Sequence, residues 1–487
     1  MISRRRFIQA GLAVLALPKS MVYAAYKPFR NNFQVPALAQ SKRVGKDVYF
    51  DLNIQSGVSR FIPNKTTKTW GINQPFLGVT LRARKGDKVH IKVKNNLNET
   101  TTLHWHGMKL PAKADGGPHQ PILPNKTWLS EYDIIQPAAT TWYHSHQLYN
   151  TGKHVYKGLA GMFIIDDDQA DALSLPSAYG VDDFPVIIQD RDFNRDGSFA
   201  YIRSMHDRMR GKMGNVILVN GVRKPVLKVK KSLIRLRILN GSNARIYHLS
   251  FDDNRDFHII ASDGGLLEQT ITANKISLSP AERVEVLVDV SDGKMPMLMH
   301  KPQQNSRRGM MNMMSMMSMM DGGGESFAIF QIDATTASNT PPKLPQKLIT
   351  HTKIPQKSVK KRSFELQMKM GMMRMLGNAF SINGKAMDIN RIDEIIKADS
   401  TEIWIINNTS MMDHPFHIHN TQFKIIKKND ISAHETGFKD TVLVRANSAV
   451  AVLIHFPKYS DKNTPYMFHC HILEHEDQGM MGQFLVV

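Results

Sequence analysis

The sequence predicts an all-β protein made of three consecutive Greek-key β-sandwich domains. Apolar and polar residues alternate at 89–95 and 234–238, the short stretch 403–405 is apolar throughout, and each of the three is closed by turn residues. Alternation with a period of two is typical of a half-buried strand, and short strands closed by turns favour Greek-key sandwiches. Three such stretches, about 150 residues apart, indicate three copies of one unit. The length of 487 residues suits three domains of ordinary size.

Residues 1–24 are predicted to be a signal peptide. Three arginines precede Phe7, a short apolar stretch follows, and Ala24 ends a small-residue cleavage site. Adjacent arginines before Phe7 resemble a twin-arginine signal, with an ordinary signal or a basic amino terminus as alternatives. The apolar stretch is too short to span a bilayer, and no other run of ~18 apolar residues occurs. We therefore expect export to the periplasm by the twin-arginine machinery and no membrane span.

A second repeat marks the domains. His144–His146 and His469–His471 form matched His-x-His pairs late in the first and third units, whereas the second unit lacks such a pair. A Pro- and Lys-rich stretch between Pro341 and Lys361 is typical of a linker. The predicted domains are residues 25–170, 180–340 and 360–487.

Composition limits the partners and the compartment. The net charge is +20, but lysine and arginine are scattered, which favours a solvated basic surface over a nucleic-acid site and leaves weak adhesion to anionic lipid open. The single cysteine, Cys470, cannot form an internal disulfide. A lone thiol in an oxidising compartment is a liability unless it is buried or bound. We expect a monomer.

Four short segments carry the chemistry. Residues i and i+2 of a strand point to the same face, so each His-x-His pair aims two imidazoles at one place. One pair arises easily by chance, but four pairs supply eight imidazoles, enough for three metal ions. Together with His414 and His475, the segments hold ten of the 20 histidines: His104, His106, His144, His146, His414, His417, His419, His469, His471 and His475.

Cys470 narrows the choice of metal. It lies between two of these histidines, so its sulfur points to the opposite face of the strand, where it can join His414 and His475. Two histidines, a thiolate and a weak axial methionine, here Met480, are the ligands of a blue-copper site. Zinc is the main alternative metal, but it cannot change redox state and would leave the eight-histidine cluster without an obvious function.

These segments resemble the four copper-binding motifs of the multicopper oxidases, the family of laccases, ascorbate oxidase and bacterial cuprous oxidases. The resemblance covers the whole mature chain and implies three cupredoxin-like domains with four copper ions, one type 1, one type 2 and two type 3. The implied ligands are His414, Cys470, His475 and Met480 for type 1, His104 and His417 for type 2, and His106, His144, His146, His419, His469 and His471 for type 3.

The resemblance also implies the reaction. One-electron oxidation of a substrate is coupled to four-electron reduction of dioxygen to water, and Cys470 carries electrons into His469 and His471. Asp115 and Glu476 resemble the acidic proton relay of the family. The alternative for either carboxylate is a solvated loop position.

Methionine is unusually abundant, with 29 residues. Residues 310–320 hold eight of them, in a run that also resembles a protein-binding surface. Thioethers select Cu(I), and methionine-rich segments near the blue copper resemble those of bacterial copper-tolerance oxidases. The predicted substrate is therefore Cu(I). Met372, Met375 and Met412 are candidate ligands for it, and Asp413 is a further candidate.

Two other functions remain open. The first is a laccase-like oxidase of phenols or diamines, in which the methionines shield the site. The second is non-enzymatic copper sequestration. A two-domain architecture like that of nitrite reductase is disfavoured by the third unit and by the four His-x-His pairs.

Overall fold

The computed structural model describes residues 29–302, 325–355, 360–369 and 379–487. The predicted signal peptide, the run 310–320, Met372 and Met375 lie outside these ranges. Among the described residues, no helix combines the length and the apolar character that a bilayer crossing requires. Strands dominate this part of the chain and form six sheets.

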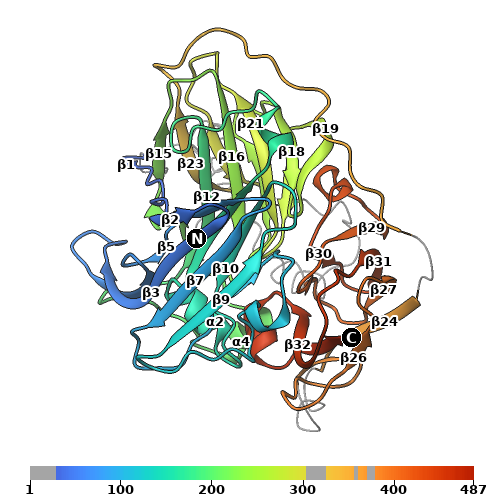
Figure 1. Cartoon of the computed structure of the whole chain (residues 1–487). Helices are drawn as coiled ribbons and strands as arrows, with labels where there is room; N and C mark the ends of the chain where they lie inside the picture. The colour runs from blue at the N-terminus through green and yellow to red at the C-terminus, as the bar shows by residue number, and fades with distance from the viewer. Residues whose placement is uncertain (1–28, 303–324, 356–359, 370–378) are drawn as a thin grey trace, which may run out of the picture.

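Two of the six sheets are built from the first third of the chain, and we call them the N-terminal pair (Figure 1). Their strands are β2 (Ser41–Val44), β3 (Asp47–Ser59), β4 (Thr67–Ile72), β5 (Leu77–Gly78), β6 (Leu81–Arg84), β7 (Lys88–Asn95), β8 (His104–His106), β9 (Thr127–Asp133), β10 (Ala139–His144) and β11 (Ala160–Asp166). One sheet has the order β5-β4-β3-β7-β9, with β2 paired to β3, and the other has the order β6-β11-β10-β8.

The next two sheets form the middle pair, drawn mainly in green and yellow in Figure 1. Their strands are β1 (Asn31–Asn32), β12 (Asp183–Arg191), β13 (Val216–Val219), β14 (Val222–Arg223), β15 (Pro225–Lys228), β16 (Leu233–Asn240), β17 (Tyr247–Phe251), β18 (Phe257–Ser262), β19 (Gly265–Ala273), β20 (Ile276–Leu278), β21 (Arg283–Asp289), β22 (Met297–His300) and β23 (Phe327–Asp333). The orders are β14-β13-β12-β16-β21-β18-β19 and β1-β15-β23-β22-β17-β20. The early strand β1 thus pairs with β15, across the predicted domain boundary.

The last two sheets form the C-terminal pair. Their strands are β24 (Lys360–Met368), β25 (Phe380–Ile382), β26 (Glu394–Ile396), β27 (Thr401–Asn408), β28 (His414–Ile418), β29 (Phe423–Lys427), β30 (Thr441–Val444), β31 (Ser448–His455), β32 (Asp461–Cys470) and β33 (Met481–Val486). The orders are β25-β24-β27-β31-β29 and β26-β33-β32-β28-β30. The all-β prediction is confirmed, whereas the bounds 25–170, 180–340 and 360–487 remain a prediction.

Short helices join the sheets. They are α2 (Thr151–Lys157), α3 (Asp168–Asp171), α4 (Met205–Arg210), α6 (Leu473–Asp477) and the 3-10 turns η2 (Ala112–Ala114) and η4 (Ala433–Thr436). Asp477 of α6 accepts the backbone N–H groups of Thr151 and Gly152 at 2.8 and 2.9 Å. A carboxylate is favourable at a helix N-terminus, so this contact fastens α6 to the first turn of α2.

The three strands predicted from alternation exist as β7, β16 and β27. In β7 the apolar residues are buried and His90 and the lysines face outward, as expected, whereas Asn95 at the end of the strand is buried. In β16 the expectation of a half-buried strand is wrong, because Arg235 and Arg237 are also buried. Each of these arginines contacts a buried carboxylate, Arg235 that of Glu285 and Arg237 that of Asp183. Paired charges can be buried where single ones cannot.

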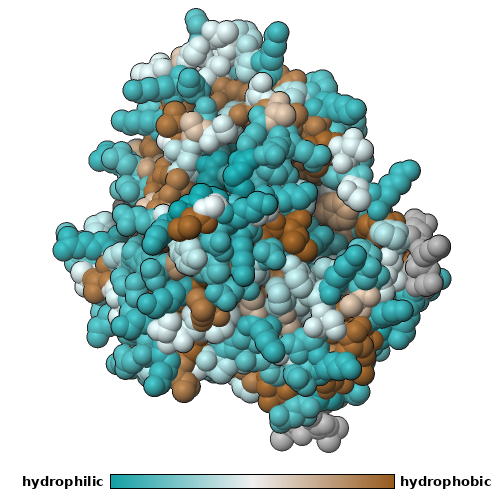
Figure 2. Space-filling view, in the orientation of Figure 1, coloured by the Kyte–Doolittle hydropathy of each residue, from teal (hydrophilic) through white to brown (hydrophobic). Residues whose placement is uncertain are grey.

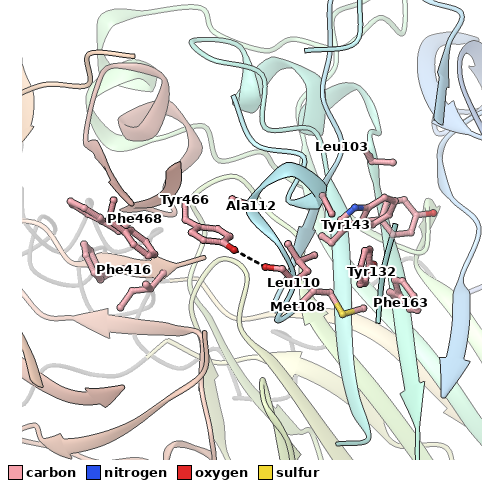
Figure 3. Close-up of a cluster of buried hydrophobic side chains, with 14 of the residues drawn as sticks. Leu103, Met108, Leu110, Ala112, Tyr132, Tyr143, Phe163, Phe416, Tyr466 and Phe468 are labelled. Atoms are coloured by element: carbon pink, nitrogen blue, oxygen red, sulfur yellow. Dashed lines mark hydrogen bonds between the residues drawn. The ribbon is translucent and has the colours of Figure 1, made fainter. Parts of the chain in front are cut away.

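One hydrophobic core runs from the N-terminal pair into the C-terminal pair. It joins Phe163 on β11 to Phe416 and Phe468 on β28 and β32. Figure 3 shows Tyr466 between these groups, and its hydroxyl donates a 2.8 Å hydrogen bond to the carbonyl of Leu110. The two sheet pairs are therefore packed together, and the functional site lies where they meet.

The surface is largely polar. Hydrophilic residues cover most of the face in Figure 2, and hydrophobic residues occur in separate patches. This distribution is what a basic chain with solvated side chains should show.

Candidate metal centre

Strand pairing brings the four histidine segments together. In the N-terminal pair, β8 lies antiparallel to β10, so His104 is opposite His144. In the C-terminal pair, β28 lies antiparallel to β32, so His417 is opposite His469. The two sets meet across the interface, where Nε2 of His146 lies 3.2 Å from Nε2 of His469. All eight imidazoles of the four pairs are at most 1% exposed.

The hydrogen bonds fix which nitrogen of each ring carries the proton. Nδ1 of His469 faces the carbonyl of Cys470 at 3.0 Å, and Nδ1 of His419 faces a carboxylate oxygen of Asp115 at 2.8 Å. Both Nδ1 atoms therefore donate, which leaves lone pairs on both Nε2 atoms. These two Nε2 atoms lie only 3.3 Å apart. Facing lone pairs repel unless a proton or a cation lies between them.

The same pattern recurs on the other side of the cluster. Nδ1 of His144 faces the carbonyl of Ser145 at 2.9 Å, so its Nε2 carries the lone pair. In His106 the roles are reversed, because Nε2 faces the carboxylate of Asp440 at 3.0 Å. The remaining atoms, Nε2 of His144 and Nδ1 of His106, lie 3.4 Å apart. Again two lone pairs converge.

Two further rings complete the arrangement. Nδ1 of His104 and of His417 face the backbone carbonyls of Asp115 and Asp440 at 3.0 and 2.8 Å. Their Nε2 atoms are buried without a hydrogen-bond partner, as are both ring nitrogens of His471. Buried polar atoms normally have partners. Orphaned and converging imidazole nitrogens are the donor set that copper, zinc, iron or nickel would fit.

A separate group of donors surrounds the cysteine. The sulfur of Cys470 lies 3.4 Å from Nδ1 of His414 and 3.7 Å from Nδ1 of His475, and these nitrogens are 3.3 Å apart. Nε2 of His475 donates to the carbonyl of Met209 at 3.0 Å, and Nε2 of His414 lies 2.8 Å from the hydroxyl of Ser410. Both Nδ1 atoms are therefore free to bind a metal together with the sulfur.

Met480 lies beside this group. Its backbone carbonyl accepts from the N–H of Cys470, and its own N–H donates to the carbonyl of His475, both at 3.0 Å. Its side chain is fully buried. The backbone thus holds Met480 next to two of the three donors.

Burial sets the protonation of these groups. It lowers the pKa of His414 to about 4, which keeps the imidazole neutral and able to bind a metal. Burial also raises the pKa of the Cys470 thiol. A thiolate is stable in such a place only with a cation beside it, and a coordinating metal ion deprotonates a thiol outright.

Two carboxylates flank the histidine cluster. Asp115 is 2% exposed and Glu476 is 1% exposed, so neither is a solvated loop carboxylate. The oxygens of Glu476 lie 3.3 Å from Nδ1 of His146 and 3.2 Å from Nδ1 of His469. Burial raises the pKa of Glu476, but the imidazoles of these two histidines outweigh it and lower the pKa to about 2. Both carboxylates are placed to exchange protons with the cluster.

Comparison with known proteins identifies the family. Two family models described as multicopper oxidase match residues 53–170 and 341–487. A multicopper oxidase, mco, of Staphylococcus haemolyticus is 36% identical over 465 residues, which cover 94% of this chain and 93% of that protein. The chain belongs to the multicopper oxidase family. The predicted resemblance is confirmed: the protein is an oxidoreductase that binds copper and uses dioxygen.

Other similar proteins include a cell division protein and two further multicopper oxidases. Cell division protein FtsP of Photorhabdus laumondii is 34% identical over 492 residues, covering 100% of this chain and 98% of that protein. The structure of a laccase-like multicopper oxidase, CueO, from Ochrobactrum sp. is 35% identical, with a TM-score of 0.82 over 93% of this chain and 100% of that one. The structure of a Campylobacter jejuni multicopper oxidase described as a metallo-oxidase is 30% identical, with a TM-score of 0.80 over 94% and 96% of the two chains. These similarities confirm the cupredoxin-like fold.

Sequence reasoning missed the partners that orient the rings of this multicopper oxidase. Asp440 and Ser410 contact ligand-type histidines, yet neither lies in a recognisable motif. Asp413 was a candidate for the substrate site, but its carboxylate bonds to Arg445 at 2.6 Å and to the N–H of Ala446 at 2.8 Å. The carboxylate is thus occupied by these partners.

The predicted substrate ligands are only partly described. Met412 is buried at 6% exposure and its carbonyl accepts from Asn408. Met372 and Met375 lie outside the described residues. One thioether-bearing element that the sequence analysis did not single out is helix α4, whose Met209 carbonyl contacts His475.

Proposed function

We propose that this multicopper oxidase oxidises Cu(I) to Cu(II), coupled to the four-electron reduction of dioxygen to water, as an exported copper-tolerance enzyme of the periplasm. Cupric ion is the less membrane-permeant form, so the reaction limits copper entry. The proposed export route is the twin-arginine machinery, since the adjacent arginines before Phe7 resemble its signal.

We assign four copper ions to the two groups of donors. The proposed ligands are His414, Cys470, His475 and Met480 for type 1, His104 and His417 for type 2, and His106, His144, His146, His419, His469 and His471 for type 3. Bound copper would supply one-electron redox chemistry at each site. Cys470 would join the two sites, because its peptide neighbours His469 and His471 belong to the histidine cluster.

The observation that carries the Cu(I) proposal is the position of methionines at the edge of His475. The ring of His475 donates through Nε2 to the carbonyl of Met209, so helix α4 is one hydrogen bond from a proposed type 1 ligand. Met205 is 52% exposed and lies four residues before Met209, which places both side chains on one helix face. Thioethers favour Cu(I) over Cu(II), so this face suits a cuprous donor.

A laccase-like oxidation of phenols is the second candidate. A pocket of about 700 Å³ lies beside α4, and Arg210, Met213, Arg245 and Phe327 are among the residues that line it. The lining combines an aromatic ring with both cationic and acidic side chains, the latter including Asp192 and Asp207, which suits a polar aromatic donor. The CueO protein of Ochrobactrum, described as active on lignin model compounds, supports this alternative.

Steady-state kinetics with two donors separate these functions. We expect the double variant Met205→Leu/Met209→Leu to lower kcat/KM for Cu(I) by about tenfold while phenol oxidation stays within about twofold. Leucine keeps the volume and removes the soft sulfur. Met295→Leu, at a residue 43% exposed elsewhere on the middle pair, is the matched control. Loss of phenol turnover with unchanged Cu(I) kinetics would favour the laccase-like function.

Deleting residues 310–320 tests the long methionine run. If these residues deliver Cu(I), the deletion lowers Cu(I) turnover and leaves phenol oxidation unchanged. If they only shield the site, phenol oxidation rises and Cu(I) kinetics do not change. Stoichiometric copper binding without any oxygen uptake would instead indicate sequestration.

Met480 gives a separate prediction. The axial ligand tunes the reduction potential of a blue-copper site, and a coordinating thioether lowers it relative to a side chain that does not coordinate. We expect Met480→Leu to raise the potential, measured by redox titration of the blue absorbance. A potential that falls or does not move would mean that the sulfur of Met480 is not a ligand.

A further inference from the structure

A buried ion pair joins the middle sheet pair to the histidine cluster. Arg283, the first residue of β21, and Asp440, which precedes β30, are both fully buried. Nη1 of Arg283 donates to one carboxylate oxygen of Asp440 at 2.7 Å, and Nη2 donates to the other at 2.6 Å. Two parallel hydrogen bonds of this kind fix the plane of the carboxylate as well as its position.

Asp440 in turn orients two proposed copper ligands. Its carboxylate accepts from Nε2 of His106 at 3.0 Å, and its backbone carbonyl accepts from Nδ1 of His417 at 2.8 Å. Each contact holds the proton on the outer nitrogen, so that the lone pair of the other nitrogen faces the cluster. Asp440 thus sets both the ring orientation and the tautomer of one proposed type 3 ligand and one proposed type 2 ligand.

The guanidinium of Arg283 has no freedom to move away. Beyond Asp440, its Nε donates to the carbonyl of Thr140 on β10, and its Nη2 donates to the carbonyl of Asp263, both at 3.0 Å. Thr140 belongs to the N-terminal pair and Asp440 to the C-terminal pair. One side chain from the middle pair therefore contacts both of the sheet pairs that supply the histidines.

A second set of charges anchors the backbone at each end of this bridge. Asp263 accepts the backbone N–H of Arg283 at 2.7 Å through one oxygen, and its other oxygen lies 2.9 Å from Nζ of Lys439. Nζ of Lys439 also lies 2.8 Å from a carboxylate oxygen of Glu282. The residues preceding Asp440 and Arg283 are thus tied to each other.

Gly107 makes room for the bridge. It follows His106 directly, has φ +87°, and a Cβ at this position would lie 2.7 Å from both Nη2 of Arg283 and Oδ2 of Asp440. A larger residue would push the ion pair away from the ring that it orients. The close approach explains why glycine ends the His104–Gly107 segment.

We propose that Arg283 is a positioning residue for the histidine cluster, acting through Asp440 on His106 and His417. In the described part of the chain, no residue of the middle pair belongs to the groups of converging donors. The middle pair would then contribute to the reaction by holding the ligands of the other two sheet pairs in their positions. The proposal rests on the proposed copper ligands and is independent of whether the substrate is Cu(I) or a phenol.

The test compares two buried arginines in the same sheet. Arg283→Lys keeps the charge but loses the planar fork, because an ammonium group is a point donor. Arg237→Lys is the matched control: Arg237 also makes a bidentate bond to a carboxylate, that of Asp183, and also contacts Thr140, but it touches no ligand-type histidine. Both proteins are purified with copper loaded.

Copper retention and spectroscopy are the readouts. We expect Arg283→Lys to keep its blue absorbance, because none of the donors around Cys470 contacts Arg283 or Asp440 through the bonds described above. It should lose the copper held by His106 and His417 to a chelator about 10–100-fold more easily than wild type. Its type 2 electron paramagnetic resonance signal should be altered, whereas Arg237→Lys should match wild type in both respects.

Two outcomes would overturn the proposal. In the first, Arg283→Lys retains copper and its type 2 signal as wild type does. In the second, both lysine variants lose copper in proportion to a lowered Tm of the metal-free protein, which indicates a purely structural arginine. Asp440→Asn provides a second variant, and combining it with Arg283→Lys should add little further loss, since both act on the same rings. Wild-type protein that binds no copper would instead refute the proposed ligands.

Discussion

Cys470→Ser protein is expected to lose its blue absorbance and to consume oxygen at least about 100-fold more slowly than wild type. The sulfur lies at the centre of one donor group, 3.4 Å from His414 and 3.7 Å from His475. The same residue is the peptide neighbour of His469 and His471 in the other donor group. Serine removes the soft thiolate that defines a blue-copper site and with it the connection between the two groups.

Metal analysis distinguishes this effect from misfolding. Serine is close to isosteric with cysteine, so the histidine cluster should still form and give a type 2 signal in electron paramagnetic resonance. Copper content should fall by one ion relative to wild type. Ser410→Ala is a useful comparison, because it removes the hydroxyl that faces Nε2 of His414 and that also bonds to Asn408 and Met412, while the sulfur of Cys470 stays in place. A serine variant that keeps its blue absorbance and consumes oxygen at the wild-type rate would contradict the assignment of Cys470.

The clustering of the candidate metal ligands could be predicted because its signal is local. His-x-His on a strand aims both rings at one face; β8 carries such a pair, and β28 carries His417, with His419 just past its end. The single cysteine between His469 and His471 points the other way for the same reason. Strand periodicity and residue chemistry were enough to group these side chains, whereas their division into copper types came from the resemblance to the multicopper oxidases.

The groups that orient those ligands could not be predicted, because they are distant in the sequence. Asp440 contacts His106 across 334 positions, and Arg283 reaches Asp440 across 157. Neither residue lies in a motif, and a lone Asp or Arg in a sequence reads as a surface charge. The burial of the two arginines of β16 could not be predicted for the same reason, because their partners Asp183 and Glu285 come from other strands.

Proton delivery gives the second large expected effect. The proposed reduction of dioxygen to water would consume protons at a cluster whose histidines are almost completely buried, and the buried carboxylates beside it are the proposed proton carriers. Asp115 contacts Nδ1 of His419 at 2.8 Å, and Glu476 lies beside His146 and His469. We expect Asp115→Asn and Glu476→Gln each to lower the turnover number by about 10²–10⁴.

The amide variants keep the shape but lose the negative charge and the ability to take up and release a proton. An Asn oxygen can still accept from Nδ1 of His419, whereas a Gln oxygen can accept from only one of the Nδ1 atoms of His146 and His469. Copper content is therefore measured for both variants. Reduction of the blue site by substrate under anaerobic stopped flow should be unchanged, whereas reoxidation by dioxygen should slow and its pH dependence should change. Asp413→Asn is the control, since that carboxylate neighbours His414 in sequence but bonds to Arg445.

The substitutions at the two carboxylates should have different effects. Burial raises the pKa of Glu476, but the neighbouring imidazoles of His146 and His469 outweigh it and lower the pKa to about 2, so we expect this carboxylate to accept protons in the proposed relay. Asp115 touches rings of two sequence segments, through its side chain to His419 and its carbonyl to His104. The backbone contact survives substitution, so Asp115→Asn should retain its copper. If both amide variants reoxidise as fast as wild type, the protons travel by another route and neither residue is part of a relay.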